Sequence, residues 1–109
     1  MRCGGIKVLA AACALVLSAA QAQQATVTVS IKDQRFQPAA VRGMAGAPTT
    51  LRLMNLDATP VEVASATLHF DRLLSPNTGV TVQVPAMPPG RYVFFNVAHQ
   101  QAQGTLEVR

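Results

Sequence analysis

The chain has 109 residues, of which 50% are hydrophobic, 13% are charged and 5% are aromatic, and its formal net charge is +4. A chain of this size has room for one hydrophobic core and not for two. The charge is modest and no basic run is interleaved with aromatic residues, so the composition does not favour a nucleic-acid-binding protein.

The start of the chain predicts a secretory signal peptide at residues 1–22. Two basic residues precede an apolar run at residues 8–20, and Ala20-Gln21-Ala22 forms a small-x-small cleavage site. The apolar run is short for a membrane span, and polar sequence follows it directly. We therefore expect cleavage near Gln23, a mature domain at residues 23–109 and a location in the periplasm.

Both cysteines, Cys3 and Cys13, fall within the predicted signal peptide. The mature domain would then have no disulfide, no thiolate metal ligand and no cysteine nucleophile. Cleavage before Cys13, as in a lipoprotein, is the alternative, and it would leave a very short apolar core. Without a covalent staple, the stability of the mature domain must come from its apolar core.

The rest of the chain predicts short strands joined by turns. The period-two alternation of β-branched and apolar residues is clearest at residues 26–31 and 80–84. The other expected strands are a short edge piece at Val41 and the segments 49–56, 61–63, 92–95 and 105–108. Residues 36–38 read as a break, and residues 68–74 fit either a strand or an irregular crossing. This spacing predicts an all-β, Greek-key β-sandwich of about seven or eight strands.

The aromatic residues supply candidates for the core, namely Phe36, Tyr92, Phe94 and Phe95. Phe94 and Phe95 are adjacent, so in a strand their side chains face opposite ways. One of the two is therefore expected to cover the other side of its sheet or an interface, although a single exposed aromatic residue is also common.

The segment from Tyr92 to Gly104 resembles the last strand-loop-strand unit of a cupredoxin. In that family an aromatic strand leads into a copper-binding cysteine, a histidine three residues later, and a methionine shortly before a glycine. His99 and Gly104 fit this pattern, but Asn96 occupies the cysteine position and Ala102 best matches the methionine. A type 1 copper site requires a thiolate, so we do not expect one in the mature domain.

A wider set of residues identifies a subgroup of this family. The set comprises Asn55, Asp57, Pro60, Glu62, Asp71, Pro89-Gly90-Arg91-Tyr92, Phe94-Phe95, His99 and Gly104-Thr105-Leu106. Together these residues resemble the cysteine-free, cupredoxin-like domains of the EfeO type, which accompany bacterial periplasmic iron uptake. The resemblance implies an iron or copper ion as ligand and periplasmic or membrane iron-transport components as partners. The chain departs from the pattern at Asn96 and Val97, where the family tends to carry acidic residues.

The candidate metal ligands are Glu62, His99, Asp71 and His69. Carboxylate and imidazole groups suit iron and Cu²⁺. Glu62 and His99 rank first because, in a cupredoxin sandwich, their two loops meet at one end. Asp71 and His69 rank second, because they share a face only if their segment is extended. The competing interpretations are a solvated Glu62, a His99 bonded to backbone, and an ordinary surface pair of His69 and Asp71.

Three further interpretations stay open. The first is a metal-free docking module for a membrane permease or another periplasmic partner. The second is a copper carrier that uses the thioethers of Met44, Met54 and Met87, although packing explains these residues equally simply. The third is oxidation of Fe²⁺, which would need an electron acceptor such as bound copper or a partner protein. Hydrolytic motifs are absent from the sequence, and nothing in it indicates the oligomeric state.

Overall fold

The structure is a computed structural model that describes residues 25–109, so the predicted signal peptide at residues 1–22 lies outside the described residues. The described part consists of nine strands and the loops between them. The strands are β1 (Ala25–Lys32), β2 (Arg35–Gln37), β3 (Ala40–Gly43), β4 (Thr49–Asn55), β5 (Val61–Ser65), β6 (Phe70–Leu74), β7 (Gly79–Val84), β8 (Gly90–Asn96) and β9 (His99–Val108). Within residues 25–109, no helix could cross a membrane.

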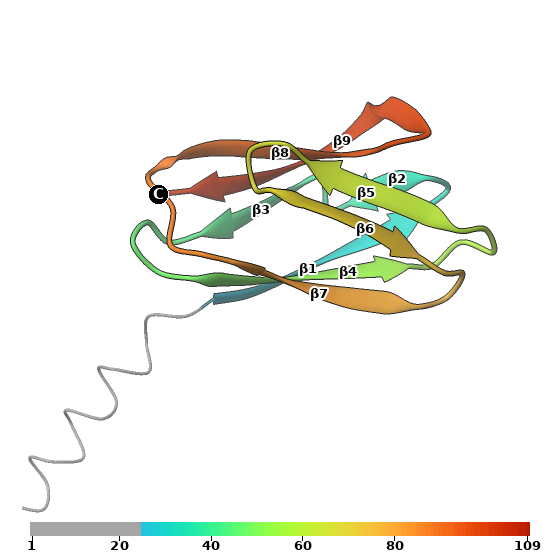
Figure 1. Cartoon of the computed structure of the whole chain (residues 1–109), viewed down its shortest axis with the longest axis horizontal. Coiled ribbons are helices and arrows are strands. Elements are labelled where there is room, and N and C mark those ends of the chain that lie inside the picture. Colours follow the sequence, from blue (N-terminus) through green and yellow to red (C-terminus); the bar gives the residue numbers. More distant parts are fainter. Residues whose placement is uncertain (1–24) are drawn as a thin grey trace, which may run out of the picture.

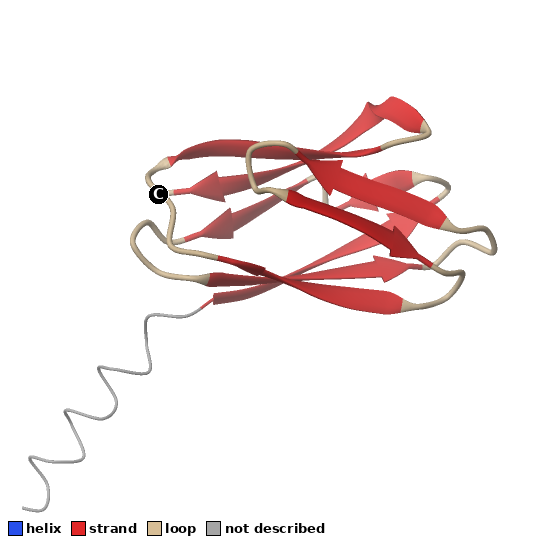
Figure 2. Ribbon diagram, viewed as in Figure 1, coloured by secondary structure: helices blue, strands red, loops and turns tan. Residues whose placement is uncertain are grey.

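The strands form two sheets that pack face to face (Figures 1 and 2). One sheet has four strands in the order β2-β1-β4-β7, and the other has five in the order β3-β9-β8-β5-β6. The pairs β1–β4 and β3–β9 are parallel, and the remaining pairs are antiparallel. The predicted all-β sandwich is therefore confirmed, with nine strands in place of seven or eight.

The core lies between the two sheets and follows the alternation seen in the sequence. In β1 and β4 the inward positions Val29, Ile31, Leu51 and Leu53 are each 0% exposed. Period-two alternation places these side chains on one face, where they pack against the opposite sheet. Burial of apolar surface of this kind contributes roughly 25 cal/mol per Å² to the stability of the fold.

The aromatic side chains divide between the core and the outer surface, as expected. Phe94 is fully buried and its ring meets that of Phe36 edge to face, with a centroid distance of 5.1 Å. Gly104 lies opposite on β9, where a Cβ atom would collide with the Phe94 ring. Phe95 points to the other side of the five-stranded sheet and is half-buried. The close approach of the Phe94 ring to the backbone of β9 explains why position 104 requires glycine.

Two segments differ from the predicted strands. Residues 35–37 form β2 where a break was expected, and β9 begins at His99 instead of at Thr105. β2 pairs with β1 through a two-residue turn at Asp33 and Gln34, whose φ angles of 52° and 64° are typical of a type I′ hairpin. Asn-Gly or Asp-Gly is the usual sequence of this turn, so the Asp33-Gln34 sequence did not predict a hairpin. The segment left open at residues 68–74 contains the strand β6.

Six of the eight connections lie at the two ends of the sandwich, whereas the β2–β3 and β5–β6 connections lie between them (Figure 1). At one end lie the β1–β2 turn, the β4–β5 loop, the β6–β7 loop and the β8–β9 connection. We call this the loop end. The β3–β4 and β7–β8 loops and the C-terminus lie at the opposite end.

Candidate functional site

The two loops expected to carry metal ligands do meet at the loop end. The Val97 amide, which follows β8, donates a hydrogen bond to the Glu62 carbonyl at the start of β5, with an N···O distance of 2.9 Å. The β1–β2 turn contacts both connections, because its Asp33 amide donates a hydrogen bond to Asp57 and its Gln34 carbonyl accepts one from Asn96. The loops therefore converge, and the groups that meet between them are backbone, amide and carboxylate groups.

Asn55, the last residue of β4, joins the β4–β5 loop to the β6–β7 loop. Its side chain is 0% exposed, and its Nδ2 donates to the carbonyl oxygens of Thr59 at 2.8 Å, Leu74 at 3.3 Å and Ser75 at 3.2 Å. Its Oδ1 accepts from the Asp57 amide at 2.9 Å. A buried amide with this many partners stabilises the loops and has no free atom to offer a ligand.

Asp57 holds the β1–β2 turn in place. Its Oδ1 accepts a hydrogen bond from the Asp33 amide and its Oδ2 accepts one from the Gln34 amide, both at 2.8 Å. Left-handed φ angles are unfavourable for residues other than glycine, and hydrogen bonds to a charged carboxylate offset that cost. The Asn-x-Asp pattern, predicted to be a turn before a metal ligand, therefore connects the β4–β5 loop to a hairpin more than twenty residues earlier in the chain.

Asn96, at the cysteine position of the cupredoxin pattern, also has a structural role. It is 1% exposed, its Nδ2 donates to the Gln34 carbonyl at 3.2 Å, and its Oδ1 accepts from the Ala98 amide at 3.1 Å. The register between β8 and β9 shifts at this point, because Phe95 pairs with Gln103 whereas Asn96 pairs with His99. Asn96 thus links the β8–β9 connection to the β1–β2 turn in the other sheet.

These residues do not fit a type 1 copper ion. That ion requires a thiolate and two imidazoles in one place. The position of the thiolate is filled by Asn96, whose amide is already paired with backbone, and Cys3 and Cys13 lie outside the described residues. Of the two histidines, only His99 lies at the loop end.

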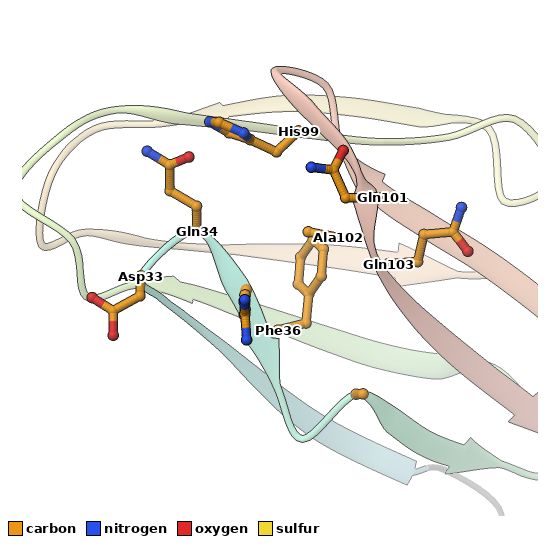
Figure 3. Close-up of a pocket in the computed structure, with 9 residues that line it drawn as sticks. Asp33, Gln34, Phe36, His99, Gln101, Ala102 and Gln103 are labelled. Carbon is orange, nitrogen blue, oxygen red and sulfur yellow. The ribbon is translucent and has the colours of Figure 1, made fainter.

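His99 lines an open groove of about 480 Å³ between the β1–β2 hairpin and β9. Figure 3 shows Asp33, Gln34 and Phe36 along one side, with His99, Gln101 and Gln103 from β9 along the other. Ala102, at the methionine position of the pattern, also lines the groove, and Glu62 is not among its lining residues. The groove offers one imidazole, the Asp33 carboxylate, the Arg35 guanidinium and several amides.

The two acidic candidates do come together, on the outer face of the five-stranded sheet. Val61, Val63 and Ser65 are buried, so Glu62 points outward from β5, and the register places Asp71 on β6 diagonally beside it. A hydrogen bond between the two carboxyl groups and the negative charge of Asp71 raise the pKa of Glu62 above its ordinary value, with a smaller contribution from burial. Two carboxyl groups side by side concentrate negative charge at this place on the sheet face.

His69 lies away from the other three candidates. It is exposed, its φ is 58°, and it ends the turn between β5 and β6, at the opposite end of that hairpin from Glu62. The segment is therefore not extended at His69, and the condition for His69 and Asp71 to share a face is not met.

The three methionines are also dispersed. Met44 is 52% exposed in the β3–β4 loop, Met87 packs against the core from the β7–β8 loop, and Met54 is half-buried in β4. Within residues 25–109, no three His, Cys, Asp or Glu side chains are close enough together to hold a metal ion. The candidate donors therefore amount to a carboxylate pair on the sheet face and a separate histidine in the groove.

Gln34 and the structural role of Asn96 were not anticipated from the sequence. Both depend on contact between residues that are 62 positions apart. The signals that pointed toward them were the Asn-x-Asp pattern at residues 55–57 and the replacement of an expected cysteine by an amide.

Sequence comparison places the chain among known proteins. The family profile described as cupredoxin-like domain matches residues 5–108. An uncharacterized protein of Rickettsia prowazekii is 31% identical over 83 residues, which cover 75% of this chain and 66% of that protein. The chain thus spans slightly less than two thirds of that relative's length.

Comparison with solved structures finds the same fold in copper proteins. The metal-binding domain of the Cu(I)-exporting P-type ATPase CopA of Streptococcus pneumoniae superposes with a TM-score of 0.72 at 11% identity, covering 81% of this chain and 88% of that domain. Auracyanin A, a blue copper protein of Chloroflexus aurantiacus, gives 0.67 at 18% identity, with coverages of 79% and 99%. A purple cupredoxin from Nitrosopumilus maritimus gives 0.62 at 17% identity, with coverages of 76% and 99%.

Proposed function

Because this chain belongs to the cupredoxin-like domain family, we propose that it is a periplasmic metal-binding accessory protein of iron or copper uptake without a type 1 copper site. In this proposal residues 1–22 direct secretion, and the sandwich presents a metal ion to iron-transport components in the periplasm or membrane. The family relation to copper proteins supports a role with metals, whereas the EfeO resemblance supports iron in particular.

The observation that carries this proposal is the pairing of Glu62 with Asp71. The strand register places the two carboxyl groups diagonally on one face, and their hydrogen bond and the charge of Asp71 raise the pKa of Glu62, so a cation bound between them would relieve their mutual repulsion. Oxygen donors suit Fe²⁺, Fe³⁺ and Cu²⁺ better than they suit Cu⁺, which prefers thioether and thiolate ligands. Two carboxylates leave most coordination positions to water or to a partner, which fits a protein that passes its ion on.

The proposal is tested by calorimetric titration of the secreted protein with Fe²⁺ in the absence of oxygen, then with Cu²⁺ and with Cu⁺. We expect saturable binding of Fe²⁺ or Cu²⁺ at one site, weakened at least about tenfold in a Glu62→Gln, Asp71→Asn double variant. Asp33→Asn is the matched control, because it removes a carboxylate from the His99 groove and leaves the pair intact.

His99→Ala separates the two candidate places. Unchanged binding in this variant assigns the ion to the outer face, and loss of binding assigns it to the groove. Absence of binding for every ion would overturn the metal proposal.

A metal-free docking module is the second candidate, and the saturated loop end favours it. The side-chain amides of Asn55 and Asn96 form hydrogen bonds with backbone groups. These bonds hold the loops in a fixed conformation and leave neither amide available as a metal ligand. Cells that lack this protein would then take up less iron, and the Glu62→Gln, Asp71→Asn variant would restore uptake in full. Failure of that variant to restore uptake would count against docking through a surface that excludes Glu62 and Asp71.

A further inference from the structure

The five-stranded sheet has one side packed on the core and one side turned away from it, and we call the latter side the outer face. The outer face has exposed apolar side chains in its middle and at its edge. Val93 on β8 is 39% exposed and Leu73 on β6 is 69% exposed, and together they are two of the four large apolar side chains that are exposed within the described residues. Phe95 and Ala64 lie side by side in the register and are half-buried on the same face. Scattered exposed apolar residues are common on protein surfaces, and what distinguishes this face is that its apolar middle lies between charges of opposite sign.

Charges of opposite sign flank this apolar middle. Glu62 and Asp71 form an acidic corner beside Leu73, at the end where β5 begins. At the other end of the strands, Arg42 on β3 and Arg91 on β8 lie in one row on either side of Glu107. Glu107 also pairs with Arg109 at 3.1 Å, so this corner keeps an excess of positive charge.

From these positions we propose that the outer face binds the outer face of a second copy of this chain. A twofold axis lying in the interface near Val93 and Phe95 would place the acidic corner of each copy over the basic corner of the other. The same axis would bring the apolar middles into contact. Twofold interfaces require a surface that complements itself, and a face with one acidic end, one basic end and an apolar centre meets that requirement.

This arrangement explains two features together. The crowded carboxyl groups of Glu62 and Asp71 gain arginines as partners, which are well suited to paired carboxylates. The outward-facing Phe95 and Val93 lose contact with water. The inference does not depend on metal binding, but an ion held by Glu62 and Asp71 would neutralise the acidic corner and weaken the dimer.

The test is sedimentation velocity of the secreted protein over a concentration range up to about 1 mM, where weak association is detectable. We expect a concentration-dependent dimer whose dissociation constant rises with salt. A monomer throughout this range, or a dimer insensitive to salt, would overturn the proposal and leave the outer face to a different partner.

A charge exchange gives the sharper result. An Arg42→Glu, Arg91→Glu variant has two acidic corners, and a Glu62→Arg, Asp71→Arg variant has two basic corners. Each alone should dimerise at least about tenfold more weakly than the wild type, and an equimolar mixture should form a heterodimer. A mixture that stays monomeric would contradict the proposal.

Arg52→Glu, on the exposed face of the other sheet, is the matched control and should dimerise as the wild type does. The Arg42→Glu, Arg91→Glu variant keeps the carboxylate pair, so its metal titration reports on the proposed function independently of dimer formation.

Discussion

The loop end and the outer face differ in how fully their polar groups are satisfied. At the loop end, Asn55 makes four hydrogen bonds to backbone groups, and within residues 25–109 every buried side-chain nitrogen and oxygen has a partner. On the outer face, Glu62 and Asp71 crowd two acidic groups together beside the exposed Leu73. The buried amides at the loop end are paired within one chain, whereas the carboxyl groups of the outer face lie at the surface, where they can bind a further partner.

Asn96 illustrates this difference. Its buried amide ties the β8–β9 connection of one sheet to the β1–β2 turn of the other. Substitutions at the loop end should therefore act on stability, whereas substitutions on the outer face should act on binding.

Asn55→Ala should be the most destabilising of these changes. It removes the partners of three carbonyl groups and of the Asp57 amide in a fully buried place, so we expect a loss of about 3 kcal/mol in the free energy of unfolding. Urea unfolding measures the loss, with the exposed Gln100→Ala as the control. A loss below about 0.5 kcal/mol would show that the loop end is not a structural lock.

Asn96→Cys should destabilise the protein without creating a copper chromophore. The loss of bonds to the Gln34 carbonyl and the Ala98 amide should cost about 2 kcal/mol. Addition of Cu²⁺ should give no intense visible band, because a single imidazole, that of His99, lies at this end and a type 1 site needs two. Urea unfolding and visible absorption are the measurements, and a strong blue or purple colour would contradict this account of the loop end.

Asp57→Ala should loosen the β1–β2 turn. Two amides would lose a charged acceptor while Asp33 and Gln34 keep their left-handed φ angles, so we expect a loss of about 1–2 kcal/mol. Faster amide hydrogen exchange confined to Asp33 and Gln34 would locate the effect, with Glu107→Gln as a surface control. Unchanged exchange at both amides would rule out the proposed role of Asp57.

Glu62→Gln should have the smallest effect on stability, and unlike the three substitutions above it should stabilise the protein. The pKa of Glu62 is raised in the folded protein, chiefly by its hydrogen bond to Asp71 and also by the charge of that residue. Between the ordinary pKa of Glu and the raised pKa, the folded state therefore binds more protons than the unfolded state. The stability of the wild type falls as the pH rises through this window. The variant should unfold at a slightly higher temperature than the wild type near pH 7.

Acidification supplies the control for this prediction. Once the pH falls below the ordinary range for Glu, Glu62 is protonated in both the folded and the unfolded states, and the advantage of the variant should vanish. Thermal unfolding at both pH values makes the comparison, and an advantage of the same size at both would exclude repulsion by Asp71 as its cause.

The sequence was sufficient to predict the sandwich because alternation marks its central strands. Val80, Val82 and Val84 alternate with polar residues, as a strand with one buried face requires. The edge strand β2 was missed because its hairpin turn, Asp33-Gln34, relies on the Asp57 carboxylate in place of a glycine. Such a turn is stabilised by a distant residue, so local propensity does not reveal it.

The candidate site was less predictable because it depends on strand register. Glu62 and Asp71 were both candidates, but their pairing requires the alignment in which Ala64 faces Asp71 across the β5–β6 hairpin. A shift of one residue would put Asp71 on the opposite face. The position of His99 depends in the same way on the irregularity between Phe95 and Asn96, for which the sequence has no clear signal.

The most direct test of the central claim is NMR titration of the secreted, ¹⁵N-labelled protein with small amounts of Fe²⁺, in the absence of oxygen, or of Cu²⁺. A paramagnetic ion broadens the amide signals closest to it, so the broadened residues identify the binding place. We predict that broadening begins at Glu62 and at residues 71–73 on the outer face. Broadening that begins instead at Asp33, Gln34, His99 and Gln101, which line the groove, would place the ion at the loop end and contradict the assignment of metal binding to the outer face.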